Sequence, residues 1–157
     1  MLLKIVKLSI IAAVVSVFAA CSNNNLFFKT VKIPDEGWYK NEAANFNVTV
    51  NDTLSGYDFY LIVRNNNDYR YSNLFVFLNT VLPNGNKTRD TIEVVLADNF
   101  GRWLGKGWGA VKENKLLLKK SLQFPLKGEY KFFIQQAMRT DTLKGITDVG
   151  LQLVKPQ

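Results

Sequence analysis

Residues 74–96 read LFVFLNTVLPNGNKTRDTIEVVL, and this stretch decides the fold class. The run 74–78 is rich in residues that favour strands, and it is stopped by Pro83-Asn84-Gly85. An Asn-Gly pair between two such runs is typical of a β-hairpin turn. The chain returns as a second run at 91–96, so the sequence predicts two antiparallel strands joined by this turn.

Similar runs occur along the rest of the chain, and helical periodicity is scarce. They lie at residues 27–33, 46–50, 57–63, 116–124, 130–134 and 149–154. In the last run we expect Val149, Leu151 and Leu153 on one face. The total of about eight strands, separated by turn residues, predicts an all-β fold, an antiparallel β-sandwich. Strand count alone leaves jelly-roll and immunoglobulin-like topologies open.

The first 20 residues have the anatomy of a signal peptide. Lys4 and Lys7 precede an apolar run from Leu8 to Ala20, which is shorter than the ~20 residues of a bilayer-spanning helix. We therefore expect residues 1–20 to be a lipoprotein signal peptide that is removed. An uncleaved membrane anchor is the alternative.

The single cysteine, Cys21, follows this leader directly. Phe18-Ala19-Ala20-Cys21 resembles the bacterial lipobox, in which the thiol receives a diacylglyceryl group and the leader is cut before the cysteine. An ordinary cleavage that leaves a free thiol is the alternative. We expect the lipid on Cys21 to tether the protein to a membrane of the cell envelope. Residues 21–26 are then a lipidated cysteine with a polar tether, and residues 27–157 a single domain. No acidic residue follows Cys21 closely, which favours a periplasm-facing protein.

The chain is basic, with a formal net charge of +7. Its densest local group of cations is Lys112, Lys115, Lys119 and Lys120. Solvated strand edges explain such a distribution, and attraction to anionic lipid or polysaccharide is the functional alternative. A nucleic acid partner is not expected for an exported lipoprotein.

Catalytic motifs are missing from the sequence. It contains no histidine, which removes histidine-based nucleophilic triads and histidine metal sites. No glycine-rich phosphate loop stands between a strand and a helix. We expect no enzyme activity, no cofactor and no metal. Paired carboxylates for glycoside hydrolysis, such as Glu36 with Glu42 or Asp141 with Asp148, are a weaker hypothesis.

The segment 96–109 is the most unusual part of the chain, because it holds four glycines and two tryptophans between strands. Glycine permits close approach of a partner, and tryptophan is a favoured anchor for sugars and proteins. We take Trp103, Gly105, Gly107 and Trp108 as candidate partner-binding residues. The structural alternative is a tight loop whose tryptophans close the end of the sandwich.

A second dense stretch, 135–146, contains Arg139, which we add to the candidate partner-binding residues. Arg139 could instead form an ordinary ion pair with Asp141 or Asp148 at a strand end, worth ~0.2–1 kcal/mol when exposed.

Several of these motifs occur together in a known family. They are Arg64-Asn65-Asn66 with Tyr69, Asn73-Leu74, the loop from Asp98 to Gly109, and Gln136-Ala137-Met138-Arg139. In this order, and with the lipobox, the chain from Trp38 to Val154 resembles the gliding motility-associated lipoprotein GldH family of Bacteroidetes-type bacteria. The resemblance implies a cell-envelope lipoprotein that accompanies the gliding machinery and its linked protein-export system, without a defined enzymatic activity.

Two functions remain in competition. The first is a non-enzymatic envelope component that docks onto other proteins of the gliding and protein-export machinery. The second is a glycan-binding β-sandwich lipoprotein that uses Trp103, Trp108 and nearby asparagines.

Overall fold

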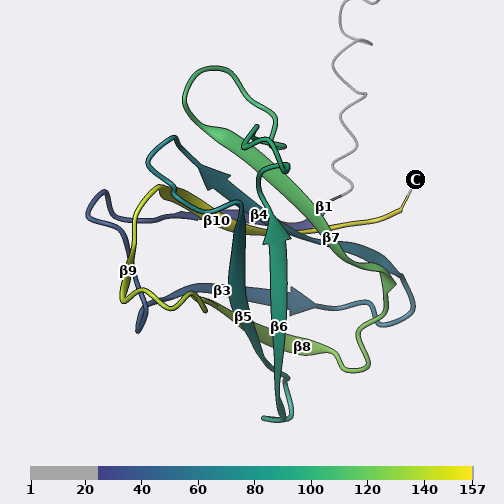
Figure 1. Cartoon of the computed structure of the whole chain (residues 1–157). Coiled ribbons are helices and arrows are strands. Elements are labelled where there is room, and N and C mark those ends of the chain that lie inside the picture. Colours follow the sequence, from purple (N-terminus) through teal and green to yellow (C-terminus); the bar gives the residue numbers. More distant parts are fainter. Residues whose placement is uncertain (1–24, 157) are drawn as a thin grey trace, which may run out of the picture.

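The predicted hairpin is present in the computed structural model, which describes residues 25–156. Strand β5 (Asn73–Val81) pairs antiparallel with β6 (Lys87–Val95), as Figure 1 shows. Gly85 adopts a left-handed φ of 85°, and the amide of Asn86 donates to Oδ1 of Asn84 at 3.0 Å. The Asn-Gly turn therefore joins the two strands as expected.

The eight long strands form two four-stranded antiparallel sheets. One sheet has the order β1 (Asn25–Lys32), β10 (Ile146–Val154), β4 (Tyr57–Asn65), β7 (Lys112–Leu122). The other has the order β3 (Ala43–Val50), β8 (Gly128–Gln136), β5, β6. A further pair, β2 (Trp38–Tyr39) with β9 (Thr142–Leu143), lies beside them. The all-β antiparallel sandwich is confirmed, with two short strands that the sequence pattern did not indicate.

The order of pairing settles the topology. The first long strand pairs with the last, the second with the seventh, the third with the sixth and the fourth with the fifth. This nested pattern is that of one long hairpin rolled into two sheets, which is the jelly roll. The jelly-roll alternative is therefore the one the chain adopts.

The core lies between the inner faces of the two sheets. Val149, Leu151 and Leu153 are fully buried on one face of β10, as predicted. The rings of Phe59 on β4 and Phe132 on β8 lie 5.4 Å apart between centroids and link the sheets. Each such buried side chain stabilises the fold by about 1.5–3 kcal/mol relative to an exposed one.

Two expected boundaries differ from the structure. Strand β1 begins at Asn25, inside the expected tether 21–26, because Asn25 is in register with Val154 of β10. Strand β7 ends at Leu122, near Ser121, whose φ is 50°. Phe124 lies beyond the strand but is buried, with its ring 4.8 Å from that of Tyr130.

The signal peptide 1–20 and the lipidation site Cys21 lie outside the described residues. Within residues 25–156 no helix is long and apolar enough to span a membrane.

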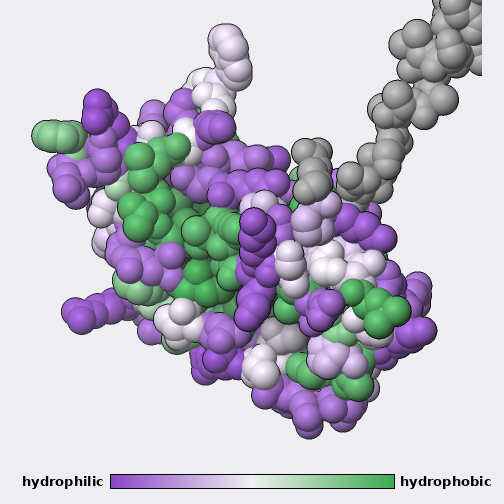
Figure 2. Space-filling model, turned by 90° about the vertical axis from the view of Figure 1, so that its right-hand side faces the viewer, coloured by the Kyte–Doolittle hydropathy of each residue, from purple (hydrophilic) through white to green (hydrophobic). Residues whose placement is uncertain are grey.

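The two sheets leave an opening between their edge strands β6 and β7. An apolar hollow of about 470 Å³ lies there, lined by core residues such as Phe59, Leu82 and Ile92. Figure 2 shows hydrophobic residues gathered in a hollow on this side of the molecule, with polar residues around it. Charged side chains such as Arg89 and Lys119 line these edges, which protects them from pairing with other chains.

The sandwich has two distinct ends. We define the proximal end as the one with the turns 51–56, 83–86 and 123–127. The strand start at Asn25 lies at this end, because Val154 is in register with both Asn25 and Asp58.

The distal end carries the four longer connections between the long strands, at residues 33–42, 66–72, 96–111 and 137–145. In Figure 1 these connections lie at the left and top of the molecule.

Candidate partner-binding site

The four motifs singled out in the sequence all lie at the distal end. Arg64-Asn65-Asn66 closes β4, and Asn73-Leu74 opens β5. The loop 98–109 leads into β7, and residues 136–139 follow the end of β8. Stretches far apart in the sequence are thus brought to one end of the sandwich.

Arg64 links three strands at this end. Its Nε and Nη2 both lie 2.8 Å from Oε2 of Glu113 on β7, and its Nη1 lies 3.8 Å from Oδ1 of Asp148 on β10. The hydroxyl of Thr147 donates to the other oxygen of Asp148 at 2.8 Å. The expected pairing of Asp148 with Arg139 is therefore wrong, because Arg64 holds this carboxylate instead.

Next to Arg64, two buried amide side chains bond to each other. Nδ2 of Asn114 donates to Oδ1 of fully buried Asn65 at 3.0 Å and to the carbonyl of Val63 at 3.4 Å. A buried amide is costly when unpaired, so this pair fixes the start of β7 against the end of β4.

The segment 136–138 ties the end of β8 to β5. Buried Gln136 donates from Nε2 to the carbonyl of Thr140 at 2.9 Å and accepts from the amide of Met138 at 2.8 Å. The sulfur of Met138 in turn accepts from the amide of Phe75 at 3.3 Å. The amide of Ala137 also donates to the carbonyl of Phe75 at 2.8 Å, so three of the four residues of this motif are structural.

Arg139 itself is exposed, and within residues 25–156 it makes no ion pair. It remains available to a partner.

The loop 96–111 is a folded structure rather than an open tether. The carboxylate of Asp98 accepts hydrogen bonds from the amides of Phe100 and Arg102 and from Nε of Arg102, at 2.9, 3.0 and 2.7 Å. These bonds, with the amide of Arg102 contributing most, hold the pKa of Asp98 below its usual value. Lys106 and Glu113 exchange two backbone hydrogen bonds at 2.8 and 2.7 Å. The loop is therefore closed by bonds at both of its ends.

Gly105 and Gly107 are explained by this loop structure. A Cβ atom at Gly105 would lie 2.9 Å from the side chain of Asn114, and one at Gly107 would lie 2.7 Å from the carbonyl of Val111. Gly107 also has a φ of 145°, which favours glycine. Both glycines let the loop return closely to β7.

The two tryptophans have different surroundings. Trp103 is half-buried, with its ring 6.4 Å from that of Tyr69 and its Nε1 donating to Oδ1 of Asn67 at 3.1 Å. It closes the end of the sandwich, as the structural alternative holds. Trp108 is fully exposed, and Phe100 and Leu104 of the same loop are also largely exposed. The exposed apolar side chains of this loop are therefore the ones that can meet a partner.

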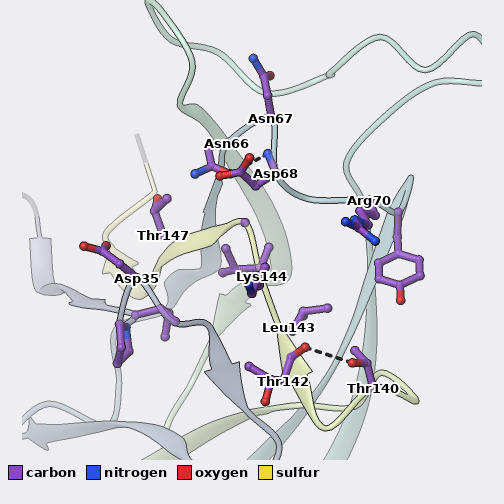
Figure 3. Close-up of a pocket in the computed structure, with 15 residues that line it drawn as sticks. Asp35, Asn66, Asn67, Asp68, Arg70, Thr140, Thr142, Leu143, Lys144 and Thr147 are labelled. Carbon is purple, nitrogen blue, oxygen red and sulfur yellow. Dashed lines mark hydrogen bonds between the residues drawn. The ribbon is translucent and has the colours of Figure 1, made fainter.

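A polar hollow of about 1010 Å³ lies between residues 33–35, the 66–72 connection and the segment 140–147. Figure 3 shows Asp35 and Thr147 on one side of it, Arg70 and Thr140 on the other, and Lys144 between them. Tyr71, whose side chain is partly exposed, also lines it. The wall thus combines amides, hydroxyls and charges with one aromatic ring.

A second hollow of about 740 Å³ lies on the other side of the 66–72 connection. It is lined by Tyr69, Asn73, Asp98 and Trp103, among others. In the part of the chain that the structure describes, no group of three or more acidic or cysteine side chains is placed to hold a metal ion.

Sequence reasoning did not identify Tyr71, Lys144 or Asn67 as site residues. The asparagines and aspartate at 65–68 are polar residues of the kind that form turns. Nothing in a single sequence shows that this turn faces the segment 142–147 across a hollow.

The comparisons with known proteins agree with the resemblance. The model of the GldH lipoprotein family matches residues 25–153. The gliding motility lipoprotein GldH homolog of Christiangramia forsetii is 39% identical over 145 residues, which cover 88% of each chain. The gliding motility lipoprotein GldH of Flavobacterium johnsoniae is 34% identical over 133 residues, which cover 80% of this chain and 82% of that one.

Proposed function

The chain belongs to the GldH lipoprotein family, and from this premise we propose that it is a non-enzymatic lipoprotein of the cell envelope. In this proposal lipid on Cys21 anchors it, with the domain facing the periplasm. Its distal end docks onto another protein of the gliding and protein-export machinery.

The observation that carries the proposal is the meeting of four separate motifs at the end that points away from the anchor. Most of these residues hold the distal end in shape, through the Arg64 ion pairs, the buried amides and the folded loop. A shape fixed in this way presents Trp108, Phe100 and Leu104 to the surroundings without further ordering. Exposed aromatic side chains on a rigid base are typical anchors of protein interfaces.

The place of Cys21 in the sequence supports this orientation. It lies four residues before Asn25, and Asn25 is at the proximal end. A partner approaching from the periplasm therefore meets the distal loops first.

The test is crosslinking in cells that contain the machinery. A photo-reactive amino acid at position 108 should capture a discrete envelope protein, and the same residue at position 54, on the proximal end, should not capture it. Trp108→Ala should reduce spreading of the colony or protein export while leaving the amount of folded protein unchanged.

Two results would count against docking. One is capture of the same proteins from both positions. The other is full spreading and export in a strain without the gene.

Glycan binding is the second candidate, and one observation favours it. The polar hollow offers amide, hydroxyl and charged groups beside the ring of Tyr71, the combination that sugar-binding sites use. Calorimetry with envelope polysaccharides should then show binding that Tyr71→Ala abolishes and Trp108→Ala preserves. No heat across a broad panel of polysaccharides would remove this candidate.

Separate experiments test the lipid anchor, the absence of enzyme activity and the orientation towards the periplasm. Mass spectrometry should find the mature chain beginning at a lipidated Cys21, and Cys21→Ala should release the domain from the membrane. Chromogenic glycosides should show no turnover. Protease added to intact cells should not cut the domain if it faces the periplasm.

A further inference from the structure

We propose that the proximal end is a contact surface for the anionic bilayer in which the anchor lies, with Leu54 at its centre. The inference deepens the proposed function, because it rests on the lipidation of Cys21. It assigns a role to the proximal end, which takes no part in the proposed docking at the distal end.

The length of the chain before the sandwich brings this end to the membrane. Three residues, 22–24, separate Cys21 from Asn25, where β1 begins. Fully extended, the four steps from Cys21 to Asn25 span at most about 14 Å. The attraction of a lysine to an anionic membrane acts over a Debye length of ~8–10 Å. The proximal end therefore stays within or near the range of the lipid charges.

The charges of the sandwich are divided unevenly between its ends. The distal half contains nine cationic and nine anionic side chains, so its net charge is zero. Lys29 and Lys115 lie at the middle of their sheet. The proximal half has four anions and seven cations, namely Lys87, Arg89, Lys119, Lys120, Lys127, Lys131 and Lys155. The basic excess of the domain is thus absent from the end that meets proteins.

The proximal lysines are also largely free of ion pairs. Four of the five ion pairs among residues 25–156 lie at the distal end, and the remaining one joins Lys131 to Glu129. Lys119, Lys120, Lys127 and Lys155 are exposed and make none. Their charges are therefore available to lipid phosphates.

Two of the acidic side chains at the proximal end, Asp52 and Asp58, accept hydrogen bonds from neighbouring residues. The side chain of Asp52 accepts hydrogen bonds from the hydroxyl of Ser55 and from the amides of Leu54 and Ser55. The carboxylate of Asp58 accepts from the amide of Ser121 at 2.9 Å. Both carboxylates keep their charge, so the seven cations and four anions leave the proximal half with a net charge of +3.

Leu54 is presented outward by the same turn. Its side chain is 85% exposed, while its carbonyl accepts from Nε2 of Gln123 at 3.0 Å. The turn is thus fixed on both sides, by Asp52 and by Gln123. A single apolar side chain among lysines fits the boundary between lipid headgroups and acyl chains.

The experiment uses the mature lipoprotein in vesicles of phosphatidylcholine with about one-third phosphatidylglycerol. Because the lipid occupies the thiol of Cys21, a Leu54→Cys variant carries one reactive cysteine for a fluorophore, and a Trp108→Cys variant gives the distal reference. A nitroxide on the lipid headgroups reports proximity. We expect about three-fold stronger quenching at position 54 than at 108.

Salt and charge reversal then test the electrostatic part. Quenching at position 54 should fall about three-fold in 1 M salt, where the Debye length is ~3 Å, and in neutral vesicles. It should fall equally after Lys119→Glu, Lys120→Glu, Lys127→Glu and Lys155→Glu are combined. The matched control reverses Lys40, Lys106, Arg139 and Lys144, which are distal, exposed and free of ion pairs, and should leave quenching unchanged.

Mass spectrometry of the same sample separates the two proposals. If Cys21 carries lipid and the label at 54 is no more quenched than the one at 108, the membrane contact is overturned and the docking proposal stands. Quenching at position 54 that is the same in high salt and in neutral vesicles also overturns the membrane contact. Binding to an anionic polysaccharide, with no more quenching on anionic than on neutral vesicles, overturns it as well. An unlipidated Cys21 overturns the anchor and the contact together.

Discussion

The backbone nitrogen of Tyr69 occupies the place that a side chain at Gly145 would need. A Cβ atom built on Gly145 would lie 2.1 Å from that nitrogen, and the φ of Gly145 is 85°. The amide of Asn66 also donates to the carbonyl of Gly145 at 2.9 Å. This close contact joins the turn between β9 and β10 to the 66–72 connection, and both line the polar hollow.

Gly145→Ala should therefore lower the free energy of unfolding by about 3 kcal/mol or more, from backbone strain and from displacement of the 66–72 connection. Gly85→Ala is the matched control, because Gly85 has the same φ of 85° but no atom within 4 Å of its Cβ position. It should cost about 1 kcal/mol. Urea titration measures both, and equal losses would show that the contact with Tyr69 is unimportant.

The amide pair at the distal end should be sensitive to truncation. Asn65→Ala removes the acceptor of Asn114, which stays buried with only its long bond to the carbonyl of Val63. We expect a loss of about 1–3 kcal/mol in the free energy of unfolding. Asn47→Ala, at an exposed position of β3, should change it by less than about 0.5 kcal/mol. Similar values for the two variants would contradict a structural role for the pair.

The two tryptophans should separate stability from binding. Trp103→Phe keeps a ring against Tyr69 but loses the bond to Asn67, so the free energy of unfolding should fall by about 1 kcal/mol. Trp108→Ala should leave stability within about 0.5 kcal/mol, since the side chain is fully exposed, and should reduce spreading of the colony or protein export. Thermal unfolding and the spreading and export assays report the two effects. A stability loss at Trp108 would assign it to the loop structure instead.

Acid should weaken the proximal turn. The side-chain bond from Ser55 and the backbone bonds from Leu54 and Ser55 lower the pKa of Asp52 from 3.8 to about 2. Because the folded pKa is depressed, this stabilisation is present above pH 3.8 and is lost as pH falls towards 2. Asp52→Asn should therefore flatten the dependence of the urea midpoint on pH between about 4 and 2.

Asp141→Asn is the control for this change, because its exposed carboxylate accepts no hydrogen bond from the residues described. It should retain the slope of the wild-type protein. An unchanged slope in Asp52→Asn would show that the turn does not depend on the ionised carboxylate.

The strands could be predicted because their own residues carry the signal. Val149, Leu151 and Leu153 alternate along β10, and Asn84-Gly85 specifies its turn locally. Strands β2 and β9 could not be predicted, because a strand of two residues is too short to show alternation of apolar and polar residues. Trp38 is buried in β2 through its pairing with Leu143, which is more than 100 residues away in the sequence.

The candidate site could be predicted only in part, because its contacts also depend on strands that are far apart in the sequence. Exposed Trp108 and Arg139 stood out by residue type, and so did Trp103, which instead closes the end of the sandwich. The partner of Asp148 was misjudged, because sequence proximity suggested Arg139 while the register of β4 and β10 places Arg64 opposite Asp148. Such contacts are decided by the pairing of strands that are distant in the sequence, and this pairing cannot be deduced from one sequence.

On a lipid-anchored chain, the short connection from Cys21 to Asn25 also limits the height of the domain above the bilayer. Its maximum reach of about 14 Å keeps the start of β1 close to the lipid. Strand β4 runs about 30 Å from one end of the sandwich to the other. When the long axis stands away from the bilayer, the sandwich therefore carries Trp108 farther out than the connection alone could reach, and a neighbouring protein can contact it without touching the lipid.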